Sequence, residues 1–186
     1  NIDRAIKKGA GELGGVTFEE LLYEGYGPGG IGLIVEVTTD NKNRSASDVR
    51  STFAKGGGNL AGAGAVAFNY KRKGQFLIAK NKMEEDTITE LAMVNDAEDI
   101  ISESDHYEIV CETAQYDALA EALSKAGVEA DSSELAYLPN NIVQISDAES
   151  ARKVLKLVES LEDLEDVKAV HGNYDMDESL LEAFSG

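Results

Sequence analysis

A turn of four glycines and one proline, packed into residues 23–30, constrains the fold of this chain more than any other feature. Glycine loses too much conformational entropy in the interior of an element and proline removes a backbone donor, so this stretch marks a break. Residues 31–38 follow as an apolar, β-branched run that ends at the turn-forming residues 39–41. The pattern predicts a buried strand that the chain enters through a tight turn with exposed backbone.

The same turn satisfies the Gly-x-Gly-x-x-Gly pattern of dinucleotide-binding loops at Gly25, Gly27 and Gly30. That motif requires a strand before it, a helix that opens at its last glycine and an acidic residue about 20 positions later. Here the strand comes afterwards, Pro28 lies inside the pattern and no helix follows directly. We therefore favour a structural turn, or a loop shaped to meet a partner, over a phosphate-binding loop, and we expect no cofactor.

Charge divides the chain into two unlike halves. Residues 1–82 hold 12 Lys and Arg against 8 Asp and Glu, whereas residues 83–186 hold 5 against 27, so their net charges are +4 and −22. An acidic surface of that size repels phosphates over about 8 Å at physiological salt. We therefore expect any nucleic-acid contact in the first half, while the carboxylates of the second half keep the protein soluble or meet a basic partner.

Length and cysteine usage bound the class of protein. A chain of 186 residues can bury a core without disulfides or metals. Its single cysteine, Cys111, excludes a disulfide framework and fits a reducing compartment, so we expect a cytoplasmic protein. No apolar run approaches 18 residues, and we expect no membrane-spanning segment. The chain begins at Asn1 with the pattern of a helix already under way, so we expect a fragment of a longer protein.

Apolar periodicity and turn residues predict an α+β protein. We expect helices over residues 47–55, 86–95 and 114–125 and from 146, and strands over 31–38, 65–70, 74–79, 99–103, 106–112, 133–138, 142–145 and 167–171. The strands at 65–70 and 74–79 flank a basic run and are predicted to form a hairpin with a basic tip.

The order of these elements predicts the domains. Residues 17–82 give strand, helix, strand, strand and lack one helix and one strand, which the later part of the chain supplies. We therefore predict a ferredoxin-like βαββαβ domain, formed by residues 17–82 plus 143–186 and split by an inserted acidic α/β domain at 83–142. Residues 1–16 are expected to be the end of an N-terminal helical domain and a linker.

The basic residues of the first half are the candidates for phosphate contact, which needs only well-placed cations and gives salt-dependent, sequence-independent binding. They lie before the first helix, on that helix and at the predicted hairpin tip: Lys42, Arg44, Arg50, Lys55, Lys71, Arg72 and Lys73. Because loop and tip need not share an edge of the fold, a single continuous patch is a hypothesis. No recognition helix for the major groove is evident, and Phe68 with Tyr70 only faintly resembles an RNA-recognition strand.

The glycine turn supplies a second candidate surface. Tyr23, Tyr26, Gly27 and Pro28 form the predicted partner-facing loop. Its two tyrosines could stack on bases or pack against the sheet, and packing is the expected fate of at least one.

Catalysis and metal binding find no support in the residues. Cys111 has no nucleophile motif around it, and His106 and His171 are far apart with no other Cys or His nearby. The carboxylates at 162–166 and 175–178 lack the spacing of a calcium loop, and no glycine-rich segment continues into Gly-Lys-Ser/Thr. We therefore expect a protein that is not an enzyme and has no metal site.

The amino-acid sequences of several segments closely resemble those of the YebC/PmpR family. The resemblance rests on residues 23–30, 39–44, 49–50, 53–57 and 59–60, and residues 1–9 look like the end of the family's N-terminal helical domain. It departs at residues 61–66, where family members often carry a serine before the valine. The resemblance covers essentially the whole chain and implies an N-terminal helical domain followed by two α/β domains.

This resemblance implies a regulator of gene expression that binds DNA, mainly through a basic helical segment expected before Asn1. The family also includes the mitochondrial translational activator of cytochrome oxidase subunit one, which implies instead a ribosome-associated translation factor that binds RNA. A protein-interaction module whose acidic domain binds a basic partner is the third possibility.

Overall fold

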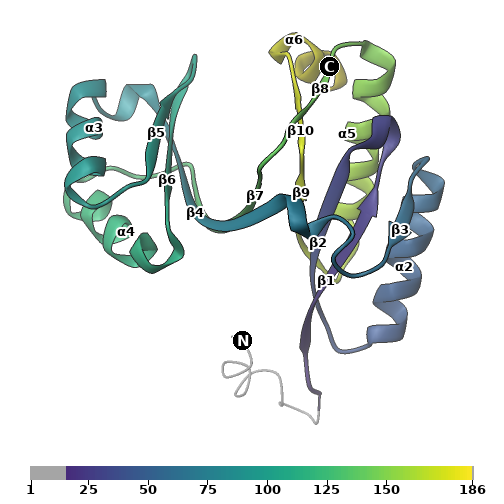
Figure 1. The fold of residues 1–186 in the computed structure, drawn as a ribbon. Helices are drawn as coiled ribbons and strands as arrows, with labels where there is room; N and C mark the ends of the chain where they lie inside the picture. The colour runs from purple at the N-terminus through teal and green to yellow at the C-terminus, as the bar shows by residue number, and fades with distance from the viewer. Residues whose placement is uncertain (1–15, 186) are drawn as a thin grey trace. The chain divides into compact units, whose positions relative to one another are not determined.

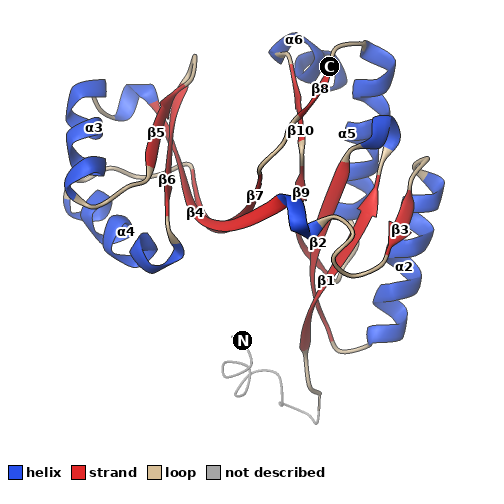
Figure 2. Cartoon of the chain, viewed as in Figure 1, coloured by secondary structure: helices blue, strands red, loops and turns tan. Residues whose placement is uncertain are grey.

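The computed structural model describes residues 16–185, which form two compact units. Unit 1 consists of residues 16–70 and 139–185, and unit 2 of residues 71–138. Each unit has a four-stranded sheet, helices packed on it and an apolar core of its own, so the protein is of the mixed α+β class (Figures 1 and 2). Residues 1–15, which include most of the expected helix end and linker, lie outside the described residues.

Unit 1 is built on an antiparallel sheet that begins with a hairpin. Its strands, in spatial order, are β3 (Asn59–Ala61), β1 (Glu19–Tyr26), β2 (Gly32–Thr39) and β9 (Val167–Gly172). The short 3₁₀ turn η2 (Pro28–Gly30) closes the hairpin, and Gly29 and Gly30 have φ values of 79° and 81° there. Side chains are strained at such angles, which explains why this turn is rich in glycine.

Two amphipathic helices cover one face of this sheet. They are α2 (Lys42–Lys55), capped by the Asn41 side chain, and α5 (Ala148–Glu162), capped by Asp147. Phe53 of α2 and Leu157 of α5 are buried with Leu33 and Val35 of β2 in one core. The cap of α2 makes the helix five residues longer than the predicted one, because the Asn41 side chain accepts a hydrogen bond from the Arg44 amide.

The remaining elements of unit 1 complete its core and link the strands. They are the 3₁₀ turn η3 (Ala67–Asn69), the parallel pair β8 (Val143–Ile145) and β10 (Tyr174–Met176), and α6 (Glu178–Ser185). The buried carboxylate of Glu24 on β1 fixes the loop before η3, because it accepts hydrogen bonds of 2.8 Å from the amides of Gly64, Val66 and Ala67.

Unit 2 places two helices against a sheet with the spatial order β5–β6–β4–β7. Its elements are β4 (Tyr70–Ala79), the 3₁₀ turn η4 (Lys80–Lys82), α3 (Glu85–Val94), β5 (Asp99–Ser102), β6 (His106–Cys111), the 3₁₀ turn η5 (Thr113–Gln115), α4 (Tyr116–Lys125) and β7 (Ser132–Pro139). Phe76 and Ile109 from the sheet and Ile88 and Leu119 from the helices are fully buried in its core.

The predicted ferredoxin-like order is wrong for unit 1. The sequence analysis missed β1, so the unit starts with two strands before its first helix instead of one. The strands predicted at 65–70 and 74–79 do not join this sheet, whose fourth strand is β9. The units also begin and end elsewhere than the predicted domains: residues 71–82 fall in unit 2, because β4 pairs with β6, and residues 139–142 fall in unit 1.

The predicted hairpin with a basic tip is also wrong, because β4 runs without a break through residues 71–74. Gly74 is buried in the strand, where a Cβ atom would lie 2.7 Å from the sulfur of Cys111 and 2.9 Å from the ring of Tyr116. The glycine therefore permits close packing and does not mark a turn.

Among the helices within residues 16–185, none combines the length and the apolar character needed to cross a membrane.

Candidate nucleic-acid interface

Arg44 is committed to an internal ion-pair network of unit 1. Its guanidinium donates to Asp40 at 2.8 Å and to both carboxylate oxygens of Asp166, with Nη2 2.9 Å from Oδ1 and Nε 3.1 Å from Oδ2. The hydroxyls of Ser45 and Thr39 also donate to Asp166. Burial alone would raise the pKa of Asp166, but these donors hold it below its ordinary value. Arg44 thus joins the start of α2 to the segment between α5 and β9.

The predicted cations at residues 71–73 belong to unit 2 and contact its own side chains. Lys73 Nζ lies 2.6 Å from Glu98 Oε1 and 2.7 Å from Glu112 Oε2, and its side chain is 11% exposed. The Arg72 guanidinium lies 4.4 Å from the centre of the Tyr137 ring. Lys71 is exposed on the same strand. These residues therefore lie within strand β4 and do not form the predicted basic hairpin tip.

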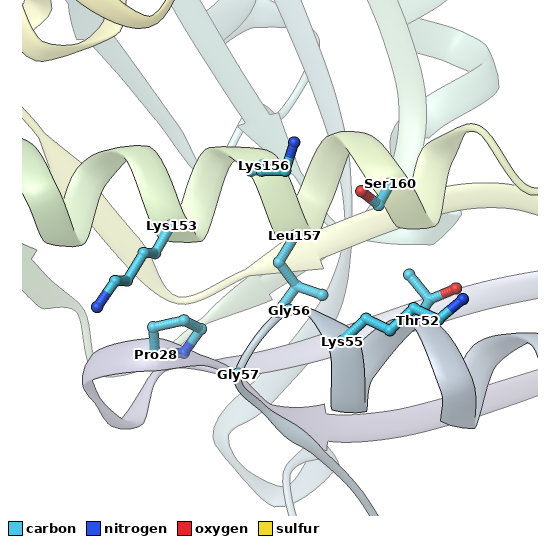
Figure 3. Close-up of a pocket in the computed structure, with 9 residues that line it drawn as sticks. All are labelled: Pro28, Thr52, Lys55, Gly56, Gly57, Lys153, Lys156, Leu157 and Ser160. Carbon is cyan, nitrogen blue, oxygen red and sulfur yellow. The ribbon is translucent and has the colours of Figure 1, made fainter.

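Lys55 lies in a hollow of about 570 Å³ between the end of α2 and the middle of α5, wholly within unit 1 (Figure 3). We call it the α2–α5 hollow. Its lining residues are Pro28, Thr52, Lys55, Gly56, Gly57, Lys153, Lys156, Leu157 and Ser160. Three of these are lysines and two carry hydroxyls, and among the described lining residues there is no Asp or Glu. In a chain with twice as many acidic as basic residues, this lining forms a local cationic site.

Glycines let the hairpin turn, the end of α2 and helix α5 approach one another closely around the hollow. A Cβ on Gly56 would lie 2.7 Å from Leu157 Cδ1, and one on Gly27 would lie 3.2 Å from Leu157 Cδ2. Gly57 has φ +85°, and its position faces the Pro28 ring. The glycine turn of the hairpin and the glycines after α2 therefore both pack against α5, with Leu157 between them.

The carbonyl oxygens at the end of α2 find partners in the glycines that follow the helix. The carbonyl oxygens of a last helical turn normally lack partners and make that end of the helix electronegative. Here the amides of Gly56, Gly57 and Gly58 donate to the carbonyl oxygens of Thr52, Phe53 and Ala54. The last turn of α2 is thus closed by backbone hydrogen bonds, and on α5 the Lys153 amine lies 3.7 Å from the Glu149 carboxylate.

The four residues of the predicted partner-facing loop have different environments: some pack within unit 1, and one lines the α2–α5 hollow. Tyr23 packs against the core of unit 1, and Tyr26 is 39% exposed and donates its hydroxyl to the carbonyl of Ala65. Gly27 is buried beneath the turn, whereas Pro28 lines the hollow.

Of the other predicted cations, Lys42 and Arg50 are exposed on α2 but do not line the hollow. The structure thus brings one predicted cation, Lys55, together with Lys153 and Lys156, which the sequence analysis missed. A signal for these two was present, because Arg152, Lys153 and Lys156 are three of the five basic residues in the acidic half. Averaging charge over 104 residues concealed them.

The groups with potential chemistry show no catalytic arrangement. Cys111 is fully buried, and burial raises the pKa of its thiol. His106 Nδ1 lies 2.7 Å from Asp105, and His171 Nε2 lies 2.6 Å from Glu36. Among residues 16–185, no cluster of three or more His, Cys, Asp or Glu side chains could hold a metal ion.

Comparison with known proteins identifies relatives of the whole described fold. The family model described as TACO1/YebC second and third domain matches residues 18–174, which includes parts of both units. A probable transcriptional regulatory protein of Opitutus terrae is 47% identical over 98% of this chain and 74% of its own length. Another, of Sulfurihydrogenibium sp., is 46% identical over 100% of this chain and 74% of its own.

A solved structure agrees with these sequence relatives. The crystal structure of a conserved hypothetical protein from Aquifex aeolicus superimposes with a TM-score of 0.83 at 42% identity, covering 95% of this chain and 73% of that one. The chain therefore belongs to the TACO1/YebC family.

Proposed function

We propose that this chain is a non-enzymatic regulator of gene expression that binds DNA, and that the α2–α5 hollow is one of its phosphate contacts. The relatives named probable transcriptional regulatory proteins support the regulator role. The single structural observation that carries the proposal is that Lys55, Lys153 and Lys156 line one hollow whose described lining has no Asp or Glu. Glu149, which is outside that lining, lies 3.7 Å from Lys153, so Lys55 and Lys156 are the main candidates.

The distribution of charge favours unit 1 for this contact. Phosphate binding requires cations that remain available to the polyanion, and each one used releases counterions and adds to the salt dependence. In unit 2, Lys73 lies between two carboxylates, and the exposed surface of α3 and β5 is rich in Asp and Glu. In unit 1, Lys55 and Lys156 extend from two different helices and are exposed.

The remaining exposed cations of α2, Lys42 and Arg50, would extend the contact along the duplex backbone. Binding of this kind positions a protein without reading sequence. We place the activity in the cytoplasm, where the one thiol, buried Cys111, is kept reduced.

The test is a titration of labelled duplex DNA at several salt concentrations, followed by fluorescence anisotropy. The double variant Lys55→Glu/Lys156→Glu is expected to lose at least about tenfold in affinity, and the slope of log K against log salt should shrink by about 2, near 0.9 per lost phosphate contact. Lys71→Glu/Lys125→Glu changes two exposed lysines of unit 2 and alters the net charge by the same amount, so it is the matched control and should bind like the unchanged chain.

Two results would contradict the proposal. One is equal loss in the double variant and in the control, which would show a response to net charge alone. The other is retention of structured ribosomal RNA with no duplex DNA binding at low salt, which would assign the chain to translation.

A further inference from the structure

We infer that the α2–α5 hollow binds a single nucleoside phosphate, with the phosphate at the lysines and the base inside the hollow. The inference deepens the proposed function and rests on it for the source of the ligand: a nucleotide displaced from a DNA single strand. A free nucleotide has the same chemistry and is the alternative source.

The size and lining of the hollow exceed what a phosphate contact needs. A phosphate on a duplex backbone requires only cations at a surface. A volume of about 570 Å³ lies within the range of about 300–1,000 Å³ typical of sites for small molecules. The space therefore suits a ligand that has a sizeable uncharged group in addition to its anionic group.

The lining indicates the chemistry of that uncharged group. Pro28 and the methylene stems of the lysines offer apolar surface, and Gly56 and Gly57 add no side-chain bulk. Leu157 is 1% exposed and lies beneath this surface. Thr52 and Ser160 add hydroxyls that can donate or accept hydrogen bonds. A flat, apolar ring with polar edges, joined to an anion, satisfies all three kinds of lining group.

The directions of the side chains fit two-part binding. In Figure 3 Lys153 reaches from α5 toward Pro28, and Leu157 points toward the end of α2 between the two lysine-bearing helices. The amines of Lys55, Lys153 and Lys156 point in different directions in Figure 3. Because Lys55 and Lys156 are exposed and a lysine stem rotates freely, an anion at the rim would draw amines from both α2 and α5 by rotation of these side chains, while a ring would rest on Pro28 and the glycines. Both parts of the ligand are therefore held within unit 1.

Pairing and stacking decide which DNA can use such a site. In a duplex the bases are stacked and paired, and extruding one costs free energy. A single strand or a free nucleotide offers its ring without that cost, so contact of the ring with the lining adds to its affinity. The hollow should therefore favour single strands over duplexes of the same sequence.

The experiment fills the hollow without changing its charge. Ser160→Phe places a ring in the hollow and keeps all three lysines, and Ser51→Phe adds the same ring on an exposed position of α2 that does not line it. Affinities of the 186-residue chain are measured for a single-stranded oligonucleotide, its duplex, a nucleoside monophosphate and ribose 5-phosphate.

We expect Ser160→Phe to lower affinity for the single strand at least about tenfold and to change affinity for the duplex less than about threefold. Ser51→Phe should change neither. The nucleoside monophosphate should bind the unchanged chain more tightly than ribose 5-phosphate, a comparison that needs no variant. If Ser160→Phe lowers the urea midpoint, Thr52→Phe fills the same hollow from the other helix.

The outcomes separate the inference from the proposed function. Duplex binding that depends on Lys55 and Lys156, with no effect of filling the hollow and no preference for the base, would overturn the inference and leave the function standing. Base-dependent binding of the free nucleotide without binding of any DNA would uphold the nucleoside phosphate site and overturn the function.

Discussion

Lys73 of unit 2 and the lysines that border the α2–α5 hollow of unit 1 have different surroundings. In unit 2, Lys73 lies on a strand directly opposite a neighbouring strand, and two carboxylates meet its amine within 2.7 Å. In unit 1, Lys55, Lys153 and Lys156 border a hollow between two helices. Adjacent strands bring side chains into fixed pairs about 5 Å apart, whereas the lysines of the hollow extend from two helices at its border, where Lys153 lies 3.7 Å from Glu149 of its own helix. The carboxylates near a cation thus decide whether a ligand can reach it, since Arg44, also on a helix, is held by Asp40 and Asp166.

The largest predicted effect tests whether the units are separate in stability as well as in structure. Phe53 and Phe76 are both fully buried, one in each core, so either change to alanine should cost about 3–5 kcal/mol through lost burial and a cavity. Native-state hydrogen exchange should show lower protection of β2 amides in Phe53→Ala and of β6 amides in Phe76→Ala. Equal losses in both sheets from either variant would mean a single cooperative body.

A smaller effect concerns Glu24, the buried carboxylate of unit 1. Burial raises its pKa, but the three amides that donate to it lower the pKa more, so the net shift is downward. Glu24→Gln leaves the Gly64 amide without an acceptor oxygen and should cost about 1–3 kcal/mol near neutral pH.

The pH dependence of this difference has a definite sign. A depressed pKa stabilises the fold above the unfolded value, about 4.3 for glutamate, and the stabilisation is lost as the pH falls through the lower, folded value. Urea unfolding of Glu24→Gln and of the unchanged chain should therefore differ at pH 7 and converge in acid. Glu121→Gln, an exposed carboxylate on α4 of unit 2, should match the unchanged chain throughout. If the difference in the free energy of unfolding between the two proteins persists at low pH, the effect of Glu24→Gln comes from the shape of the side chain and not from its charge.

The smallest predicted effect compares the contributions of Lys156 and Lys73 to DNA affinity. Lys156→Gln should weaken DNA binding by about three- to tenfold, since one phosphate contact is lost, whereas Lys73→Gln should stay within about twofold because two carboxylates already neutralise that amine. Both are measured by anisotropy at the same salt concentration. The reverse ranking would transfer the phosphate contact to unit 2.

Sequence patterns predicted those elements whose cause is local. The strand after the glycine turn, the capped start of α5 and the apolar stripe of that helix all appear where expected, because glycine, Asp147 and helical periodicity act within a few residues. The basic hairpin failed for the opposite reason. Gly74 between two apolar runs has the pattern of a turn, yet it serves the packing of Cys111 and Tyr116 from distant segments.

Only part of the candidate site could be found in the same way. Lys55 follows from its place in a basic stretch near glycines, but Lys153 lies almost a hundred residues later in a half dominated by carboxylates. Their meeting depends on α5 returning to the face of the sheet that α2 covers. The fate of Arg44 depends likewise on Asp166, which is 122 residues away in the sequence.

The sequence by itself determined the α+β class, the glycine turn with its strand, and membership of a family whose relatives cover almost the whole chain. The tertiary structure decided the strand order, the unit to which β4 belongs, and which lysines share a surface. The reason is physical: propensity and capping act over a few residues, whereas charge pairing and cavities depend on segments that only the folded chain brings within a few ångströms.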